Sequence, residues 1–298
     1  MDGILNVYKP KEWTSHDIVA KIKKITGEKV GHTGTLDPLA QGVLPVLIGK
    51  GTLCSKYLVN HNKKYRVELK LGKRTDTLDA EGEVIEEKEV PEELLEKLNI
   101  ENIRKNLKKF EGQIEQIPPM YSAIKVKGKK LYEYARKGQN VEIPTRKIMI
   151  YSIDLVDILK SENVIVFDVF CGKGTYIRTL CEDIAKSFGT IGFMQNLLRT
   201  QVGEFRLEDS ISLLMKDEKD LEVIGKNIIS IEKIFSQYPK IKIEQQTLKY
   251  FLNGVRITQN VKDGVYRVYT EDKFLGIGVV KEKLLKRVEA MNETGKKE

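Results

Sequence analysis

The sequence predicts an α+β protein of two domains, and three observations support this prediction. The chain has 298 residues, about twice the length of a typical domain. Helix-like and strand-like patterns alternate through residues 1–236, whereas residues 239–298 change to short alternating strands. The hydrophobic fraction of 41% is enough for a sizeable core and excludes a disordered chain. We therefore expect a large N-terminal domain and a small β-rich C-terminal domain.

The first elements are a strand and a helix. Residues 4–8 form a predicted strand that ends at a Lys-Pro pair. Thr14 or Ser15 can cap a helix that runs through Thr26, because isoleucine and valine recur there at helical spacing. Gly27 then closes the helix, since glycine tolerates the left-handed conformation common after a helix end.

The middle of the N-terminal domain alternates between loop and strand signals. Residues 31–42 are rich in Gly and Pro and are expected to be a loop, and an apolar run follows at 43–48. Residues 65–71 alternate between apolar and polar side chains, as a half-buried strand does. A helix is expected to open at Pro91, because proline is favoured in the first helical turn.

The last part of this domain combines a buried strand with a helix. Residues 164–170 are nearly all apolar, which indicates a central strand. The Gly-Lys-Gly at 172–174 is expected to turn the chain into a helix from about Thr175. A domain boundary is predicted at Pro239. Beyond it we expect a strand, a short helix, two strands around residues 270–273, and a frayed tail.

The charge distribution points to a nucleic-acid partner. The formal net charge is +8, and residues 120–150 hold eight Lys/Arg against two Glu. Three tyrosines lie in the same stretch, which suits phosphate binding with base stacking, although a solvated loop has the same composition. The candidate RNA contacts are Lys125, Lys127, Lys129, Lys130, Arg136 and Arg146.

Several other function classes lack their sequence signals. The three cysteines form no CxxC pair and the three histidines are far apart, so neither a disulfide framework nor a metal site is expected. There is no Walker loop, no calcium loop and no G-x-S-x-G elbow. No apolar run approaches the length of a membrane span and no secretory signal is visible, so a cytoplasmic protein is expected.

Four residues stand out as candidates for chemistry. Asp37 is the only Asp between Asp17 and Asp76, and Pro38 restricts its backbone. It suits a nucleophile, although an Asx turn or a helix cap is the commoner role for an aspartate in such a loop. Arg178, in the first turn of the predicted helix, can hold a distant carboxylate or contact phosphate. Two tyrosines that begin elements, Tyr65 and Tyr176, can stack on a base or pack in the core.

Five segments, in order, resemble the TruB-type tRNA pseudouridine-55 synthases over essentially the whole chain. They are GILNVYKP (3–10), VGHTGTLDPLA (30–40), KYRV (64–67) with RTDT (74–77), QIPPMYSA (116–123) and GKGTYIRTL (172–180). The segment after Pro239 resembles a PUA domain, which is an RNA-binding module. Two positions depart from the family pattern: Leu198 replaces an arginine, and Gln41 replaces a small hydroxyl residue.

The resemblance implies a role for each matching residue. Asp37 matches the catalytic aspartate, Tyr65 the tyrosine that stacks on the target base and takes its C5 proton, and Arg178 the arginine that pairs with the aspartate. His32 matches the residue that fills the gap left by the flipped nucleotide. The other matches are Tyr176 and Leu197, around the target base, Lys9 and Pro10, which support the active-site loop, and residues 120–150, a mobile insertion that clamps the tRNA T-arm.

The resemblance also implies the fold and the reaction. It predicts a pseudouridine synthase domain over 1–236, with a mixed, mostly antiparallel sheet flanked by helices, and a short, β-barrel-like PUA domain over 239–298. The expected activity is guide-independent isomerisation of the T-loop uridine at position 55, by base flipping, in a monomer without cofactor, metal or protein partner. The alternatives are a non-catalytic RNA-binding or tRNA chaperone protein and a synthase of the guide-RNA-dependent branch.

Overall fold

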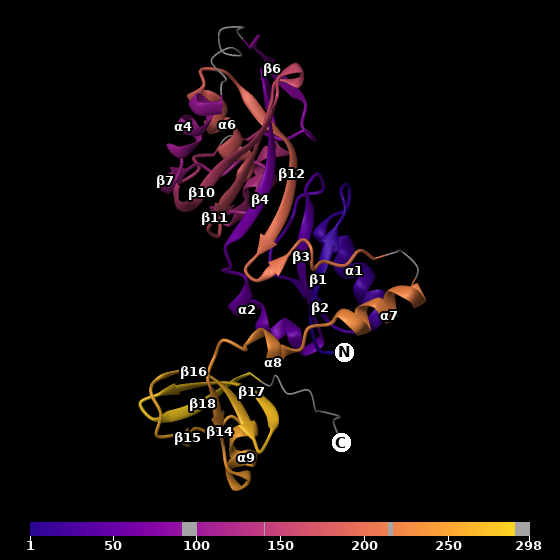
Figure 1. Cartoon of the computed structure of the whole chain (residues 1–298), viewed down its shortest axis with the longest axis vertical. Helices are drawn as coiled ribbons and strands as arrows, with labels where there is room; N and C mark the ends of the chain where they lie inside the picture. Colours follow the sequence, from indigo (N-terminus) through magenta and orange to yellow (C-terminus); the bar gives the residue numbers. More distant parts are fainter. Residues whose placement is uncertain (91–99, 140, 214–216, 290–298) are drawn as a thin grey trace.

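A nine-stranded sheet carries the larger part of the chain (Figure 1). The computed structural model describes residues 1–90, 100–139, 141–213 and 217–289. The main path of the sheet, in spatial order, is β1 (Gly3–Lys9), β3 (Gln41–Ile48), β12 (Gly192–Val202), β4 (Lys63–Leu71), β11 (Val164–Cys171), β10 (Arg146–Leu159) and β7 (Gly112–Gln116). β2 (Val30–His32) pairs with β3, and β13 (Phe205–Arg206) with β12.

The pairing within this sheet confirms the predicted mixed, mostly antiparallel arrangement. β12 runs parallel to β3, and the other pairs described in the sheet are antiparallel. The alternation in residues 65–71 is observed in β4, where the odd-numbered side chains are buried. Residues 164–170 form the interior strand β11, as their apolar composition predicts.

Helices cover two separate parts of the sheet. α1 (Ser15–Thr26) begins with a capping box between Thr14 and Asp17, ends at Gly27 with φ 69°, and packs on β1 and β3. α4 (Ile100–Lys108) packs on β10, and α6 (Ile177–Ser187) packs on β12 and β4. The short elements η1 (Gly49–Cys54) and α2 (Ser55–Leu58) lead into β4.

A second, five-stranded sheet forms the C-terminal part. Its order is β14 (Lys240–Lys242), β16 (Gly264–Thr270), β17 (Lys273–Lys281), β18 (Leu284–Glu289) and β15 (Ile257–Thr258), with α9 (Gln245–Leu252) beside it. The sequence patterns identified three of these strands but not β15 or β18. Helices α7 (Asp217–Asn227) and α8 (Ile231–Ile234) connect the two sheets (Figure 1). The architecture is the α+β fold that the sequence predicts.

Of three further sequence-based expectations, two concern residues that the structure does not describe and one is corrected. The helix predicted at Pro91 and the tail beyond residue 290 lie outside the described residues. The basic stretch 120–150 contains a small hairpin of β8 (Lys125–Val126) and β9 (Lys129–Lys130), followed by α5 (Leu131–Ala135). Its last residues are not part of an insertion, because Arg146 begins β10 and pairs with Gln116 of β7. No helix in the described part of the chain is long and apolar enough to cross a bilayer.

Candidate active site

A cavity of about 520 Å³ opens where the β2–β3 loop, β4, β12 and the start of α6 meet. Five of the residues predicted from the sequence line it: Asp37, Tyr65, Tyr176, Arg178 and Leu197. They lie up to 160 positions apart in the chain, so the fold brings them together. Lys9, Pro10 and His32 do not line the cavity, and neither do the six predicted RNA contacts.

The Arg178 guanidinium joins two carboxylates. Its Nη2 lies 3.1 Å from Oδ2 of Asp37, and its Nη1 lies 3.3 Å from Oδ2 of Asp79. It also donates to the carbonyl oxygens of Thr77 and Tyr121. The Asp79 side chain is 3% exposed, whereas that of Asp37 is 40% exposed. Arg178 is therefore fixed from the buried side, and it presents Asp37 to the cavity.

The backbone around Asp37 is held on both sides. Lys9, at the end of β1, is fully buried and its ammonium donates to the carbonyl oxygens of Pro10, Trp13 and Pro38. Ser15 exchanges two hydrogen bonds with the backbone of Leu36, at 2.8 and 3.0 Å. Leu36 is thus tied to the start of α1 and Pro38 to the end of β1, which limits the movement of the Asp37 carboxylate.

Tyr65 lies beneath the cavity on the inward face of β4. Burial raises the pKa of its phenol to about 12. Across the sheet, Arg199 of β12 is the register partner of Tyr65, and its guanidinium contacts the phenol. Sequence reasoning missed Arg199, although it lies two positions after Leu197 and therefore on the same face of a strand.

Tyr176 and Leu197 form further parts of the wall. The side chain of Gln116 accepts from the backbone N–H of Tyr176 at 2.8 Å and donates to its carbonyl oxygen at 3.0 Å. This pair anchors the start of α6 to the end of β7. Leu197 is 6% exposed and lines the cavity together with Ile177 and Met194. The cavity is therefore lined both by these apolar side chains and by the Asp37–Arg178 ion pair.

Comparisons with known proteins agree with this geometry. The model of the TruB family pseudouridylate synthase N-terminal domain matches residues 21–177, and that of the pseudouridine synthase II TruB C-terminal domain matches residues 239–286. tRNA pseudouridine synthase B of Clostridium kluyveri is 46% identical over 296 residues, covering 97% of this chain and 99% of the relative. The chain belongs to the TruB family of pseudouridine synthases. Pseudouridine synthases are isomerases, and this chain is one of them.

Other members and neighbours extend the similarity of this TruB-family chain. tRNA pseudouridine synthase B of Caldanaerobacter subterraneus subsp. tengcongensis is 46% identical over 283 residues, covering 94% of this chain and 95% of the relative. A chain of a Cbf5-Nop10-Gar1 complex aligns with a TM-score of 0.69 at 28% identity, covering 96% of this chain and 84% of that one. A chain of an H/ACA RNP bound to a substrate RNA containing 2′-deoxyuridine aligns with a TM-score of 0.68 at 26% identity, covering 98% and 85%.

The basic hairpin of this TruB-family chain lies beside the cavity. We use "basic hairpin" for residues 125–130, which form β8, β9 and their turn. Lys125, Lys127 and Lys129 are exposed there. The ring of Tyr132, which lines the cavity, lies 5.3 Å from the Lys130 ammonium and 5.4 Å from the Arg136 guanidinium. Positive charge is therefore concentrated next to the cavity entrance.

His32 is the last residue of β2, before the loop that carries Asp37. Burial, together with the nearby charges of Arg199 and His16, lowers the pKa of its imidazole. Its Nδ1 is buried and has no hydrogen-bond partner among the described residues. The imidazole is therefore neutral near pH 7, and the role implied for it in filling the gap of a flipped nucleotide stays a prediction.

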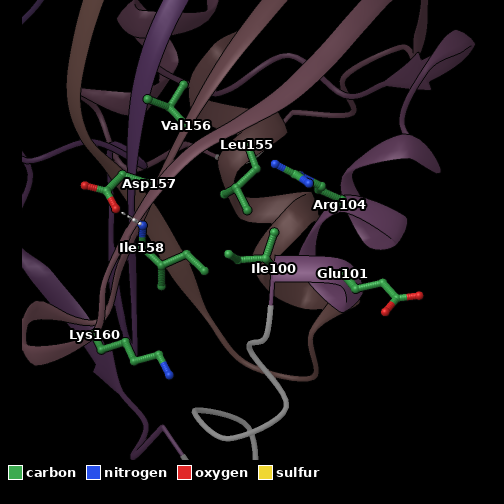
Figure 2. A pocket seen from close by; sticks show the side chains of 8 residues that line it. All are labelled: Ile100, Glu101, Arg104, Leu155, Val156, Asp157, Ile158 and Lys160. Carbon is green, nitrogen blue, oxygen red and sulfur yellow. Dashed lines mark hydrogen bonds between the residues drawn. The ribbon is translucent and has the colours of Figure 1, made fainter.

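A larger cavity of about 660 Å³ lies elsewhere, between α4 and the end of β10 (Figure 2). Ile100, Leu155 and Ile158 form its centre, and the Asp157 carboxylate accepts from the backbone N–H of Ile158 at 2.8 Å. None of the predicted site residues lines it. Its aliphatic centre lacks the paired carboxylate and guanidinium of the smaller cavity, which is therefore the candidate active site.

The activity is expected to depend on pH through the buried Lys9. Burial lowers the pKa of the Lys9 ammonium to about 8, so the charged form predominates below pH 8 and is lost above it. The ammonium has three N–H donors for three carbonyl oxygens, whereas the neutral amine has two, so one of the three hydrogen bonds that Lys9 makes around the Asp37 loop is lost. We expect the single-turnover rate to fall above about pH 8.

This decline is measured from pH 6.5 to 9.5 with saturating RNA. The matched variant is Lys9→Met, which has no titrating group at this position. Lys9→Met is expected to react more slowly than the wild type, and its rate should not fall near pH 8. Any change of rate with pH that arises from the RNA itself should remain in both proteins. The same fall near pH 8 in both proteins would contradict the assignment to Lys9.

Proposed function

We propose that the chain converts the uridine at position 55 of the tRNA T-loop into pseudouridine, without a guide RNA. Two relatives named tRNA pseudouridine synthase B, each 46% identical over nearly the whole chain, support the substrate. The observation that carries the proposal is the Asp37–Arg178 pair, which faces Tyr65 across one cavity. Under this proposal Asp37 and Tyr65 are the catalytic residues, and Arg178 positions Asp37.

The reaction breaks the bond between C1′ and N1 of uridine and forms a bond between C1′ and C5. The Asp37 carboxylate can attack C1′, or it can remove the C2′ proton to give a glycal intermediate. An attack at C6 of uracil is a third route. Arg178 supplies a fixed cation on the buried side, so the free edge of the carboxylate is oriented towards the substrate.

The detached uracil has to turn over without leaving the site. A cavity of about 520 Å³ with an apolar wall at Leu197 is suited to hold one base and to let it rotate. Tyr65 lies at the base of this cavity, where it can stack on the ring and accept the C5 proton. The nucleotide must first flip out of the RNA, at a cost of a few kcal/mol, which contacts of the basic hairpin with phosphate would offset.

The chemistry requires no cofactor. The substrate and product are isomers, so no electrons are transferred, and no phosphoryl group moves. Across residues 1–90, 100–139, 141–213 and 217–289, no group of three His, Cys, Asp or Glu side chains is placed to hold a metal ion. We further propose that a cytoplasmic monomer acts without a protein partner, with residues 1–236 as the catalytic domain and residues 239–298 as a short PUA-like RNA-binding domain.

A tritium-release assay tests this function. The purified protein is incubated with an isolated T-arm stem-loop that carries tritium at C5 of the target uracil, without guide RNA or added metal. Release of tritium that requires the T-loop uridine is expected. Tight binding without release would instead favour the non-catalytic RNA-binding alternative, and release only with a guide RNA would favour the guide-dependent branch.

Removing charge from the basic hairpin is expected to weaken RNA binding but not the chemical step. In the triple variant Lys125→Gln/Lys127→Gln/Lys129→Gln, each lost phosphate contact should reduce the salt dependence of log Kd by about 0.7–0.9. Dissociation constants measured between 50 and 300 mM salt check this, and the rate at saturating RNA should not change. The matched control, Lys105→Gln/Lys108→Gln/Lys109→Gln at the end of α4, should keep the original salt dependence.

A further inference from the structure

Arg199 is the largest fully buried side chain of the described residues. The carboxylate that acts on its charge is that of Asp37. Burying a cation in this way is costly unless other groups replace its water. Three backbone carbonyl oxygens do so: that of Val43 at 2.7 Å, that of Gly34 at 3.1 Å and that of Thr35 at 3.4 Å. All three belong to the segment that carries Asp37.

The backbone of Arg199 is fixed on both sides. It pairs with Tyr65 of β4 and, in the parallel sense, with Gly42 of β3. Gly42 has φ 107°, and a Cβ at this position would lie 2.2 Å from the carbonyl oxygen of Arg199, so only glycine allows the two strands to approach this closely. The guanidinium is thereby directed between the Asp37 segment and the phenol of Tyr65.

We propose that Arg199 is a positioning residue that fixes the Tyr65 phenol relative to Asp37 and stabilises the phenolate of Tyr65 during proton transfer. The inference rests on the proposed function. The phenol is faced by Arg199 from β12, by the Cys171 thiol from β11 and by the Asp37 carboxylate from the loop. Arg199 is the cation of this group, so it favours the phenolate, whereas burial opposes it.

Other charged and titratable groups surround Arg199. Burial and the charge of Arg199 both lower the pKa of three neighbouring groups: Lys9 of β1, His32 of β2 and Lys63 of β4. Their cationic forms repel the guanidinium, whereas the Asp37 carboxylate and a phenolate at Tyr65 attract it. Of these two groups, the Tyr65 phenol is the one that the guanidinium contacts, so Arg199 can stabilise its phenolate at the moment when the base acts.

In the proposed step, Tyr65 is the base that removes the C5 proton. After C5 has bonded to C1′, the Tyr65 phenolate oxygen takes the C5 proton and becomes the neutral phenol. The electron pair of the C5–H bond forms the C5=C6 double bond, the π pair of the C6=N1 bond moves to N1, and N1 takes a proton from solvent. The phenol then returns its proton to solvent through the cavity, and Arg199 keeps its own protons throughout.

A double-mutant cycle tests the inference. Single-turnover tritium release is measured across pH for the wild type, Arg199→Gln, Arg199→Lys, Tyr65→Phe and Arg199→Gln/Tyr65→Phe. Deprotonation of the Tyr65 phenol should give the pH profile a rising limb, separate from the fall assigned to Lys9. We expect Arg199→Gln to slow release by on the order of 10²-fold and to move this rising limb to higher pH, with Arg199→Lys intermediate. When Tyr65 is already Phe, the Gln substitution should change the rate by less than about twofold.

The controls separate this role from a structural one. Arg206→Gln removes an exposed arginine from β13 and should leave the rate and the pH profile unchanged. Additive effects in the cycle, or an unshifted pH profile, would overturn the inference. If thermal melting shows that Arg199→Gln does not fold, Arg199→Lys with and without Tyr65→Phe provides the same cycle. A wild type that releases no tritium would contradict the proposed function itself, an outcome distinct from an active wild type with additive effects.

Discussion

Asp37→Asn is expected to lower pseudouridine formation by about 10⁴-fold or more while leaving RNA binding largely intact. Asparagine keeps the shape of the side chain but provides neither a nucleophile for C1′ nor a base for C2′. Stability should change little, by ~1 kcal/mol or less, because the Asp37 side chain is 40% exposed and Arg178 keeps Asp79 as a partner. Single-turnover tritium release and a filter-binding isotherm with the same T-arm RNA measure both effects.

Asp168→Asn is the matched control for this substitution. Asp168 is also a partly exposed aspartate, 43% exposed, and both of its oxygens accept from the Arg66 guanidinium, at 2.8 and 2.9 Å. It lies on β11 and does not line the cavity. Its loss should leave the activity unchanged. Equal losses of RNA binding and of turnover in Asp37→Asn would show that Asp37 serves binding rather than chemistry.

Arg178→Gln is expected to damage both stability and activity. Without the guanidinium, the 3% exposed carboxylate of Asp79 loses its cation and Oδ2 is left unpaired, which should cost about 3 kcal/mol of the free energy of unfolding. Asp37 also loses the group that orients it, so turnover should fall on the order of 10²-fold. Urea unfolding and single-turnover tritium release measure the two effects.

A second substitution separates these effects. In Arg178→Gln/Asp79→Asn, the buried carboxylate has been removed, so most of the lost stability should return. The activity should not return, because Asp37 still has no cation. Recovery of both would mean that Arg178 acts only by supporting the fold. Arg66→Gln, which breaks an exposed ion pair on the same sheet, is the control for loss of an arginine.

The local elements were predictable where one residue type determines the geometry. Thr14, Asp17 and Gly27 define both ends of α1, and the period-two pattern of residues 65–71 defines the buried face of β4. The grouping of Asp37, Tyr65 and Arg178 was expected from the family resemblance alone, because no local pattern relates residues this far apart. The distances between these three residues, and their hydrogen-bond partners, depend on the order of the strands in the sheet, which the sequence patterns do not reveal.

The charged residues that were missed show the limit of sequence patterns. Asp79 and Arg199 look like surface residues in a sequence, since buried charges are rare. Only tertiary contacts turn them into partners of the site: Asp79 through Arg178, and Arg199 through three carbonyl oxygens. The basic stretch also looked uniform in the sequence, although Arg146 begins β10, an interior strand of the main sheet that pairs with β7 and β11.

The connection between the two sheets has a consequence for folding. Phe235 of the connecting segment packs in one apolar cluster with Ile4 and Leu47 of the large sheet and with Phe274 and Ile277 of the small one. Separating the sheets would expose this cluster to water, at a cost that grows with the apolar area uncovered. The C-terminal sheet therefore contributes to the cooperativity of unfolding, and a thermal scan of the whole chain is expected to show one transition rather than two.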